Sequence, residues 1–279
     1  AILYAKSSPA AIHWGLPIDM DPEGTSVAHA IICLWSITGN IDIPGGNVIA
    51  RPSHGVSSYP YSTEELVDLY GEELVTKLTH KRIGADVYPM VKNFRGWAQP
   101  DMAIDQINTG KPYPIKGAWI QTANILGGQA ARARLHYEAL KKLDFVVVVD
   151  LFHNPTSMAL ADIFLPAATF AEKNSFRAWW APLSVIQKRV QVGQCKSDWE
   201  INFEMARRFN PEGMKKWNTL EDLFNERLAS SGMTFAEIQE RGGWVMPEQG
   251  PFKPYLRHEK GLLRKDGKPG FETSTGKVE

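Results

Sequence analysis

Residues 144–150 read Asp144-Phe145-Val146-Val147-Val148-Val149-Asp150, an unbroken apolar run that ends in a carboxylate. A run without polar alternation is typical of a strand that is buried on both faces, as the strands of parallel sheets are. Ligands of open α/β sheets bind beside the carboxyl ends of the strands. Asp150 is therefore expected at a ligand site, and a nucleotide-type cofactor is the expected ligand.

Strands and helices alternate on both sides of this run. Gly117–Thr122 and Asp162–Leu165 predict two further strands, with helices over 128–142 and 155–160. Pro166 cannot continue a strand ladder, so it is expected to open another helix. This βαβαβ order predicts an α/β fold, with layers of Rossmann-like parallel sheet, flanking helices and right-handed crossovers.

Local signals predict the remaining elements. In the first half they indicate a strand over 9–15, a helix over 25–38 that Thr25 or Ser26 caps, and a helix within 62–81. In the second half they indicate extended segments at 176–180 and 184–192, a helix from Ser197 to Phe209 with a Ser197/Glu200 capping box, two amphipathic helices within 219–241 and coil from Gly242.

Four regions are predicted from this order of elements. They are the end of one α/β cofactor-binding domain (1–55), a variable insertion or linker (56–112), a Rossmann-like α/β cofactor-binding domain (113–210), and a helical cap with a linker toward a further domain (211–279).

Composition excludes several classes of protein. The formal net charge of zero favours neither nucleic acid nor an anionic membrane as partner. No apolar run approaches the ~20 residues that span a bilayer, so direct membrane insertion is not expected. The two cysteines, Cys33 and Cys195, are too few for a disulfide framework or for a four-cysteine iron–sulfur site.

Polar residues follow two of the predicted strands where a nucleotide site needs them. Thr122, Ala123 and Asn124 follow the first strand, and Asp150, Phe152 and Asn154 end and follow the second. A carboxylate can accept two hydrogen bonds from an amino-imino edge such as that of guanine. Alternatively, Asp150 and Asn154 cap the next helix, and the pattern alone leaves both interpretations open.

Other motifs with a known mechanism are missing. No G-x-G-x-x-G follows a strand and no G-x-x-x-x-G-K is present, which disfavours ordinary dinucleotide and P-loop sites. The seven histidines show no H-x-x-x-H or H-E-x-x-H spacing, and G-x-S-x-G is absent. Zinc enzymes and α/β hydrolases therefore lose support, and no metal ligand is predicted.

A series of short motifs along the chain resembles one family. The motifs are Ile12–Gly15, Thr38–Ile41, Pro44–Gly46, Gly117–Ile120, Asn124, Val147–Phe152, Ala161–Ala167, Glu172–Asn174, Ser197–Ile201 and Thr275–Glu279. In this order they resemble the dimethyl sulfoxide reductase family, the molybdopterin oxidoreductases that bind two molybdopterin guanine dinucleotides with molybdenum or tungsten.

The resemblance implies roles for particular residues. Trp14, Gly15 and Leu16 match a strand end that lies against a pterin or its pyrophosphate, and Thr122–Asn124 match a turn that approaches the other nucleotide. Asp150 matches the aspartate that reads guanine. Asn154 matches a residue, often Thr in relatives, that helps to hold the same nucleotide.

Two departures from the family pattern concern the substrate pocket. Arg51 falls where formate dehydrogenases carry an active-site arginine, but their R-G-Q-N-N is Arg51–Gly55, R-P-S-H-G, in this chain. Their G-x-G-x-x-Q loop is Gly15–Met20, G-L-P-I-D-M. Because of its position, Arg51 is the candidate catalytic residue. Because of the two departures, a substrate pocket different from that of formate dehydrogenases is expected.

The resemblance also implies what the chain does. It is expected to be the central cofactor-binding region of an enzyme of two-electron or oxygen-atom transfer, with a small-molecule substrate and an iron–sulfur electron-transfer subunit as partners. The metal ligand and an iron–sulfur cluster are implied in a segment upstream of these residues, so the isolated chain is expected to be inactive. No localisation is indicated.

Two alternatives remain open. The first is a non-catalytic scaffold of the same fold, as in the large iron–sulfur subunit of respiratory complex I. The second is a nicotinamide-dependent Rossmann enzyme, which the missing glycine fingerprint disfavours.

Overall fold

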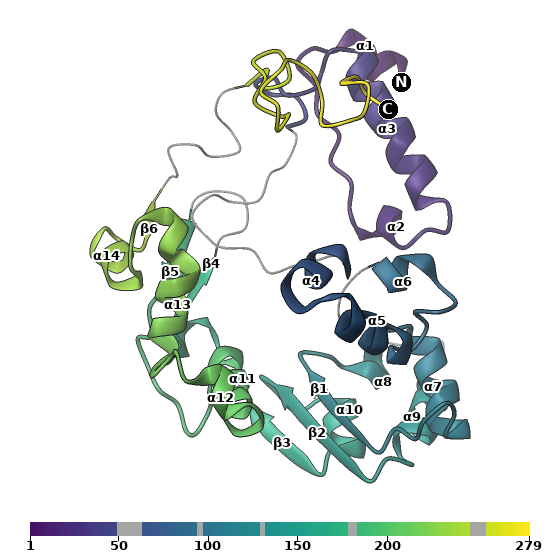
Figure 1. Cartoon of the computed structure of the whole chain (residues 1–279), viewed down its shortest axis with the longest axis vertical. Helices are drawn as coiled ribbons and strands as arrows, with labels where there is room; N and C mark the ends of the chain where they lie inside the picture. The colour runs from purple at the N-terminus through teal and green to yellow at the C-terminus, as the bar shows by residue number, and fades with distance from the viewer. Residues whose placement is uncertain (49–62, 94–96, 129–131, 178–182, 246–254) are drawn as a thin grey trace. The chain divides into compact units, whose positions relative to one another are not determined.

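The computed structural model describes residues 1–48, 63–93, 97–128, 132–177, 183–245 and 255–279 (Figure 1). The chain divides into two compact units, and each is described by itself. Unit 1 consists of Ala1–Val56, Arg177–Ser184 and Trp244–Glu279, and unit 2 of Ser57–Phe176 and Val185–Gly243. The four regions outlined from the sequence stay a prediction.

A parallel sheet of three strands forms the centre of unit 2 (Figure 1). Its strands are β1 (Gly117–Gln121), β2 (Phe145–Asp150) and β3 (Ile163–Pro166), in the order β1-β2-β3. Gly117 pairs with Phe145, and Val147 pairs with Ile163. The predicted α/β class and the parallel sheet are confirmed, and the structure places the valine strand between the other two.

The valines of β2 are buried on both faces of the sheet, as their lack of alternation predicts. Val147 and Val149 pack with Ala167 and with Ile201 of α11 (Asp198–Phe209). Val146 and Val148 belong to a second cluster that also includes Ile120. Burial of each such side chain stabilises the fold by about 1.5–3 kcal/mol.

Short helices connect the strands of this sheet. α8 (Ile125–Gly128) and α9 (Ala133–Leu140) lie between β1 and β2, and α10 (Pro155–Leu160) lies between β2 and β3. α10 has the predicted bounds. The single helix predicted over 128–142 is wrong at its start, because Gly128 ends α8; residues 129–131 lie outside the described part of the chain.

The prediction that Pro166 opens a helix is wrong. Pro166 is the last residue of β3, and a short 3-10 helix, η2, begins only at Phe170 (Phe170–Glu172). The backbone N–H of Ala167 donates to Asp150 O at 3.0 Å, and that of Ala168 donates to Lys196 O at 2.9 Å. Because these bonds keep the chain extended after the proline, the helix cannot start there.

Four further helices of unit 2 precede the sheet. They are α4 (Thr63–Tyr70), α5 (Glu72–Lys81), α6 (Pro89–Asn93) and α7 (Pro100–Thr109). The helix predicted within 62–81 is thus two helices. Gly71, with φ of 82°, separates them, because a left-handed residue cannot continue a right-handed helix.

The second half of unit 2 is helical. Ser197 caps α11, with Glu200 completing the predicted capping box, and α11 ends at Phe209 as predicted. The elements that follow are α12 (Pro211–Met214), α13 (Leu220–Leu228), η3 (Ala229–Ser231) and α14 (Phe235–Glu240). The two amphipathic helices predicted within 219–241 are α13 and α14.

A second sheet has the order β4-β5-β6. Its strands are β4 (Ser175–Arg177), β5 (Leu183–Ile186) and β6 (Trp244–Val245). The segment predicted at 184–192 is correct in place but too long, since β5 ends at Ile186. Of the segment predicted at 176–180, residues 176 and 177 belong to β4, and residues 178–180 lie outside the described part of the chain. The prediction of coil from Gly242 onward is wrong at β6, because Val245 and Trp244 pair antiparallel with Leu183 and Ser184.

Unit 1 holds α1 (Ile2–Lys6), α2 (Leu16–Asp19) and α3 (Gly24–Ile37), and α3 agrees with the helix predicted over 25–38. The predicted cap at Thr25 or Ser26 is wrong, because the N-cap is Glu23 and no side chain caps the helix. The strand predicted over 9–15 is wrong. The backbone of this segment forms its hydrogen bonds with side chains and not with a neighbouring strand. Ala10 N donates to Asn40 Oδ1 at 3.0 Å. Asn47 binds both backbone groups of Ile12, accepting from N at 2.9 Å and donating to O at 2.8 Å.

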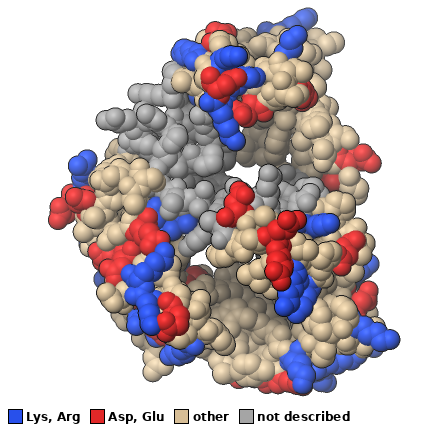
Figure 2. Space-filling view, viewed as in Figure 1, with Lys and Arg blue, Asp and Glu red and all other residues tan. Residues whose placement is uncertain are grey.

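Figure 2 shows basic and acidic side chains interspersed over the described residues of one face. None of the described helices combines the length and the apolar character that a membrane span requires.

Candidate functional site

The predicted residues of unit 2 gather at the carboxyl ends of β1 and β2. Asp150 is the last residue of β2, and Thr122 directly follows β1. Thr122 has φ of 56°, which turns the chain sharply, and its N–H donates to Val149 O at 2.9 Å. Ala123 packs against the buried valines, so its role in the described structure is to fix this loop.

The Asp150 carboxylate is half-buried and held by two short hydrogen bonds. Oδ1 accepts from the Leu151 N–H at 2.7 Å, and Oδ2 accepts from Asn154 Nδ2 at 2.8 Å. An ionised carboxylate has about four acceptor positions, so each oxygen keeps acceptor capacity. The carboxylate is therefore a fixed acceptor at the strand end.

Asn154 fits the capping interpretation, one of the two that the sequence left open. It caps α10, because its Oδ1 accepts from the Ser157 N–H at 3.0 Å and Ser157 Oγ accepts from the Asn154 N–H at 2.9 Å. Its Nδ2 also fixes Asp150. Asp150 does not cap α10 itself; it accepts a hydrogen bond from the side chain of the capping residue, Asn154.

Asn124 lies in the loop after β1 and is tied to α10. Its Oδ1 accepts from the Gly127 N–H at 3.0 Å and from Thr156 Oγ1 at 3.0 Å. Thr156 is fully buried, and its Oγ1 also accepts from the Leu126 N–H at 2.9 Å. Sequence reasoning missed Thr156, because only its place in the first turn of the helix after Asp150 marked it.

Apolar side chains surround the Asp150 loop. Phe152 is 74% exposed, Met158 78% and Leu151 46%. Phe152, a predicted site residue, therefore presents its ring outward in the described structure. Large exposed apolar groups beside a polar cluster are typical of a ligand or protein contact.

Three predicted site residues, Trp14, Gly15 and Leu16, belong to the described part of unit 1. Trp14 stacks on Trp35 of α3, with ring centroids 5.3 Å apart and planes 12° apart. Gly15 is the N-cap of α2, and Leu16 is its exposed first residue. The altered segment at Gly15–Met20 is thus mostly one helical turn.

Trp35 carries a polar group that is buried without a partner. Among the described residues, nothing accepts a hydrogen bond from its Nε1. The candidate catalytic residue, Arg51, lies outside the described residues.

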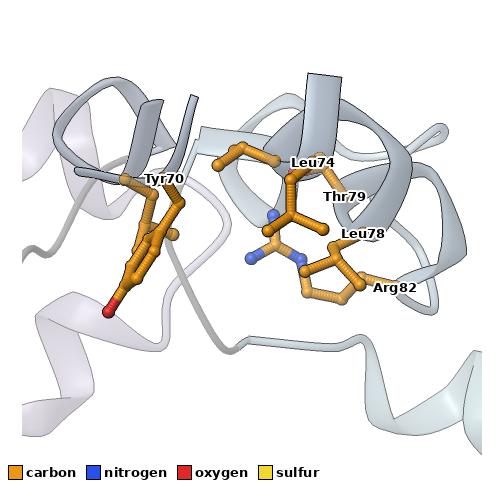
Figure 3. A pocket seen from close by; sticks show the side chains of 7 residues that line it. Tyr70, Leu74, Leu78, Thr79 and Arg82 are labelled. Atoms are coloured by element: carbon orange, nitrogen blue, oxygen red, sulfur yellow. The ribbon is translucent and has the colours of Figure 1, made fainter. Parts of the chain in front are cut away.

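Two apolar hollows lie among the described residues of unit 2. One, of about 370 Å³, is lined by side chains of α4 and α5 and by Arg82 (Figure 3). Tyr70 stands on one side of it, with Leu74 and Leu78 on the other. The second, of about 670 Å³, is lined by Trp119, Phe145 and further residues of the sheet and α11. Neither includes Asp150 or Asn124.

Glu172, the first residue of a family-like motif, is a structural acceptor. Its carboxylate accepts from Thr169 N at 3.0 Å and Oγ1 at 2.8 Å, Val192 N at 3.2 Å and Cys195 Sγ at 3.1 Å. The Thr169 N–H, the Cys195 thiol and the Thr169 hydroxyl together lower the pKa of Glu172 to about 2. Burial, with this carboxylate, raises the pKa of the Cys195 thiol, which disfavours a nucleophile.

The Glu172→Gln variant is expected to melt at a lower temperature than wild type near neutral pH. The pKa of Glu172 lies below the ordinary value, so its stabilising effect is full above about pH 4.5 and is lost as the pH falls toward 2. Calorimetry from pH 7 to pH 3 should show the difference narrowing below about pH 4. The exposed control Glu240→Gln should show no such trend; a pH-independent difference for Glu172→Gln would contradict the assignment.

No group of three or more His, Cys, Asp or Glu side chains suited to a metal ion occurs within the described ranges.

Comparison with known proteins relates the whole chain to one family. Acetylene hydratase from Syntrophotalea acetylenica is 26% identical over 305 residues, which cover 100% of this chain and 39% of the relative. Dopamine dehydroxylase from Eggerthella lenta is 32% identical over 201 residues, 69% of this chain and 18% of the relative. The chain thus spans two fifths or less of the length of these relatives.

A solved structure shows the fold of this chain, and a family model shows its family. The solved structure of acetylene hydratase from Pelobacter acetylenicus has the same fold, with a TM-score of 0.73, 24% identity, and coverage of 100% of this chain and 39% of that one. The family model that matches is the molybdopterin oxidoreductase model, over residues 2–208. Its match to most of the sequence confirms the resemblance found in the motifs: the chain belongs to the molybdopterin oxidoreductase family.

Proposed function

We propose that this chain is the region of a molybdenum or tungsten oxidoreductase that binds the nucleotide ends of two molybdopterin guanine dinucleotides. Asp150 reads one guanine from the end of β2. Thr122 and Asn124 lie at the other strand-end loop, and Trp14, Gly15 and Leu16 contact a pterin or its pyrophosphate. The family match supports cofactor binding in general, and the geometry at Asp150 supports the guanine form.

The observation that carries this proposal is the immobilised carboxylate of Asp150. Leu151 N and Asn154 Nδ2 each bind one oxygen, at 2.7 and 2.8 Å, which fixes the plane of the carboxylate. Guanine presents two adjacent N–H donors, on N1 and N2, and a fixed pair of acceptors complements them. An adenine edge, with one donor beside an acceptor, does not complement them.

The protein and the cofactor have different tasks in this proposal. When bound, the pterin dithiolenes and the metal supply electron or oxygen-atom transfer. Asp150 and Asn124 anchor the nucleotide, and this anchoring fixes the direction in which the rest of the cofactor extends. Asn154 holds Asp150 by its amide, so it contributes through the carboxylate. The exposed ring of Phe152 gives the base an apolar surface.

The reaction belongs to the complete protein. The names of the two relatives describe a hydration and a dehydroxylation, so cofactor binding, rather than one reaction, is carried over to this chain. A small-molecule substrate, an upstream iron–sulfur cluster and an iron–sulfur electron-transfer partner complete the proposal. The isolated chain is expected to be inactive.

The first test is the cofactor content of the complete protein, purified without oxygen from its native host. Molybdenum or tungsten, with about two GMP released per metal by acid hydrolysis, is the result expected for a bis-dinucleotide enzyme. A folded protein with neither metal nor GMP would overturn the proposal and favour the non-catalytic scaffold.

The second test is the Asp150→Ala variant of the complete protein. Loss of a charged hydrogen bond costs about 1.5–3 kcal/mol, so we expect at least about tenfold weaker retention of guanine nucleotide. The matched control is Asp144→Ala, an exposed aspartate that precedes the same strand at its other end. Equal GMP content in both variants would show that Asp150 does not read guanine.

A further inference from the structure

We propose that Thr156 is a positioning residue of the nucleotide site, which acts by fixing the side-chain amide of Asn124. This inference rests on the proposed function and adds a residue to it. Thr156 lies in the first turn of α10 with a fully buried side chain. It therefore cannot touch a ligand at the surface, and any effect on binding must pass through a neighbour.

The hydrogen bonds of Thr156 decide how Asn124 is oriented. The single hydroxyl proton of Thr156 is donated to Asn124 Oδ1 at 3.0 Å, while the hydroxyl oxygen accepts from the Leu126 N–H. The Gly127 N–H donates to the same Oδ1, so both lone pairs of that oxygen are used. A flipped amide would set Nδ2 against the Gly127 N–H, donor against donor, and is disfavoured.

The consequence is a defined chemistry at the mouth of the loop. Asn124 is exposed, and with Oδ1 occupied it offers ligands only the two N–H donors of Nδ2. Such a side chain binds acceptor oxygens, as in a pyrophosphate or a base carbonyl. Asp150 at the next strand end offers only acceptors. The two loops thus present opposite hydrogen-bonding groups to the nucleotides.

A second turn in the same chain separates this role from ordinary loop structure. Asn210 and Gly213 repeat the local geometry, with Asn210 Oδ1 accepting from the Gly213 N–H at 3.0 Å. In both turns a Cβ on the glycine would lie too close to the asparagine Nδ2. The Asn-x-x-Gly turn therefore forms without a ligand. What distinguishes Asn124 is the second bond, from Thr156.

The test is a double-mutant cycle in the complete protein, with GMP retained per protein after dialysis as readout. Thr156→Val removes the hydroxyl at nearly constant volume, and we expect retention to fall about five- to tenfold. Thr156→Ser should restore it. In the Asn124→Ala background, Thr156→Val should have no further effect, because the residue acts through Asn124.

Each other outcome is decisive. If wild type holds no guanine nucleotide, the proposed function itself fails. Suppose that wild type holds guanine nucleotide. If Thr156→Val then retains as much GMP as wild type, the positioning role is overturned while the function stands. The same follows if Thr156→Val lowers GMP retention as much in the Asn124→Ala background as it does alone. If Thr156→Val does not fold, Thr156→Ala replaces it, since it removes the same hydroxyl donor to Asn124 Oδ1. Retention should then fall for Thr156→Ala and not for Thr156→Ser, which keeps the hydroxyl; equal retention overturns the inference.

Discussion

The Arg257→Leu variant is expected to destabilise unit 1 by about 3–5 kcal/mol, because it leaves a buried carboxylate without its counter-ion. Asp42 is 0% exposed and Arg257 is 2% exposed. Arg257 Nη2 donates to Asp42 Oδ1 at 2.7 Å, and the Arg257 N–H donates to Oδ2 at 2.8 Å. Leucine keeps most of the apolar volume but supplies none of the side-chain donors.

Local hydrogen–deuterium exchange in the complete protein measures this effect. Exchange at residues 38–47 and 255–262 should accelerate, since these segments meet at the ion pair. The matched control is Arg264→Leu, whose Nη2 also lies 2.7 Å from a carboxylate oxygen, that of Asp266, but in a pair whose side chains are 22% and 41% exposed. A much smaller change is expected there. Equal changes in the two variants would show that burial does not govern the effect.

The Phe224→Ala variant is expected to destabilise unit 2 by about 3–5 kcal/mol, because it empties the centre of an aromatic cluster. Phe224 of α13 is 1% exposed. Its ring lies 5.3 Å from Phe176, 5.4 Å from Trp199 and 5.5 Å from Phe235, measured between centroids. The first two contacts are edge-to-face, which adds to the energy of burial.

Calorimetric unfolding of the complete protein should show this loss as a lower melting temperature of the transition that contains unit 2. Phe209→Ala, at a ring that is 81% exposed, should change stability by less than about 0.5 kcal/mol. A melting temperature for Phe224→Ala equal to that of Phe209→Ala would contradict the description of this cluster as a core.

Elements with local causes were predictable from the sequence. The four consecutive valines of β2 predicted a buried strand, because a strand that is buried on both faces has no position for a polar side chain. Ser197 with Glu200 gave the start of α11, and their reciprocal capping bonds are present. In both cases the physical cause lies within a few residues of its effect.

Elements with distant causes were not predictable. The strand expected over 9–15 is a loop because Asn47, 35 residues away from Ile12, supplies its hydrogen bonds. Likewise β6 exists only because β5 pairs with it. Residue-by-residue signals carry no information on such partners.

The candidate site divides in the same way. The position of Asp150 at a strand end followed from the strand pattern. The bond from Asn154 to Asp150 spans four residues and was within reach of local reasoning. The bond from Thr156 to Asn124 spans 32 residues and depends on the packing of α10 beside the loop after β1. Neither partner carries a sequence signal for it.

The separation of Asp42 and Arg257 sets an order of events during synthesis. The two residues are 215 positions apart, and most of unit 2 lies between them in the chain. A ribosome that adds about 5–20 residues per second makes Arg257 roughly 10–40 s after Asp42. During that interval the apolar helix α3 has been made, but residues 244–279 of the same unit have not. Unit 2 is thus expected to fold before unit 1 is complete, and nascent residues 1–48 are expected to need chaperone protection until residues 255–279 are made.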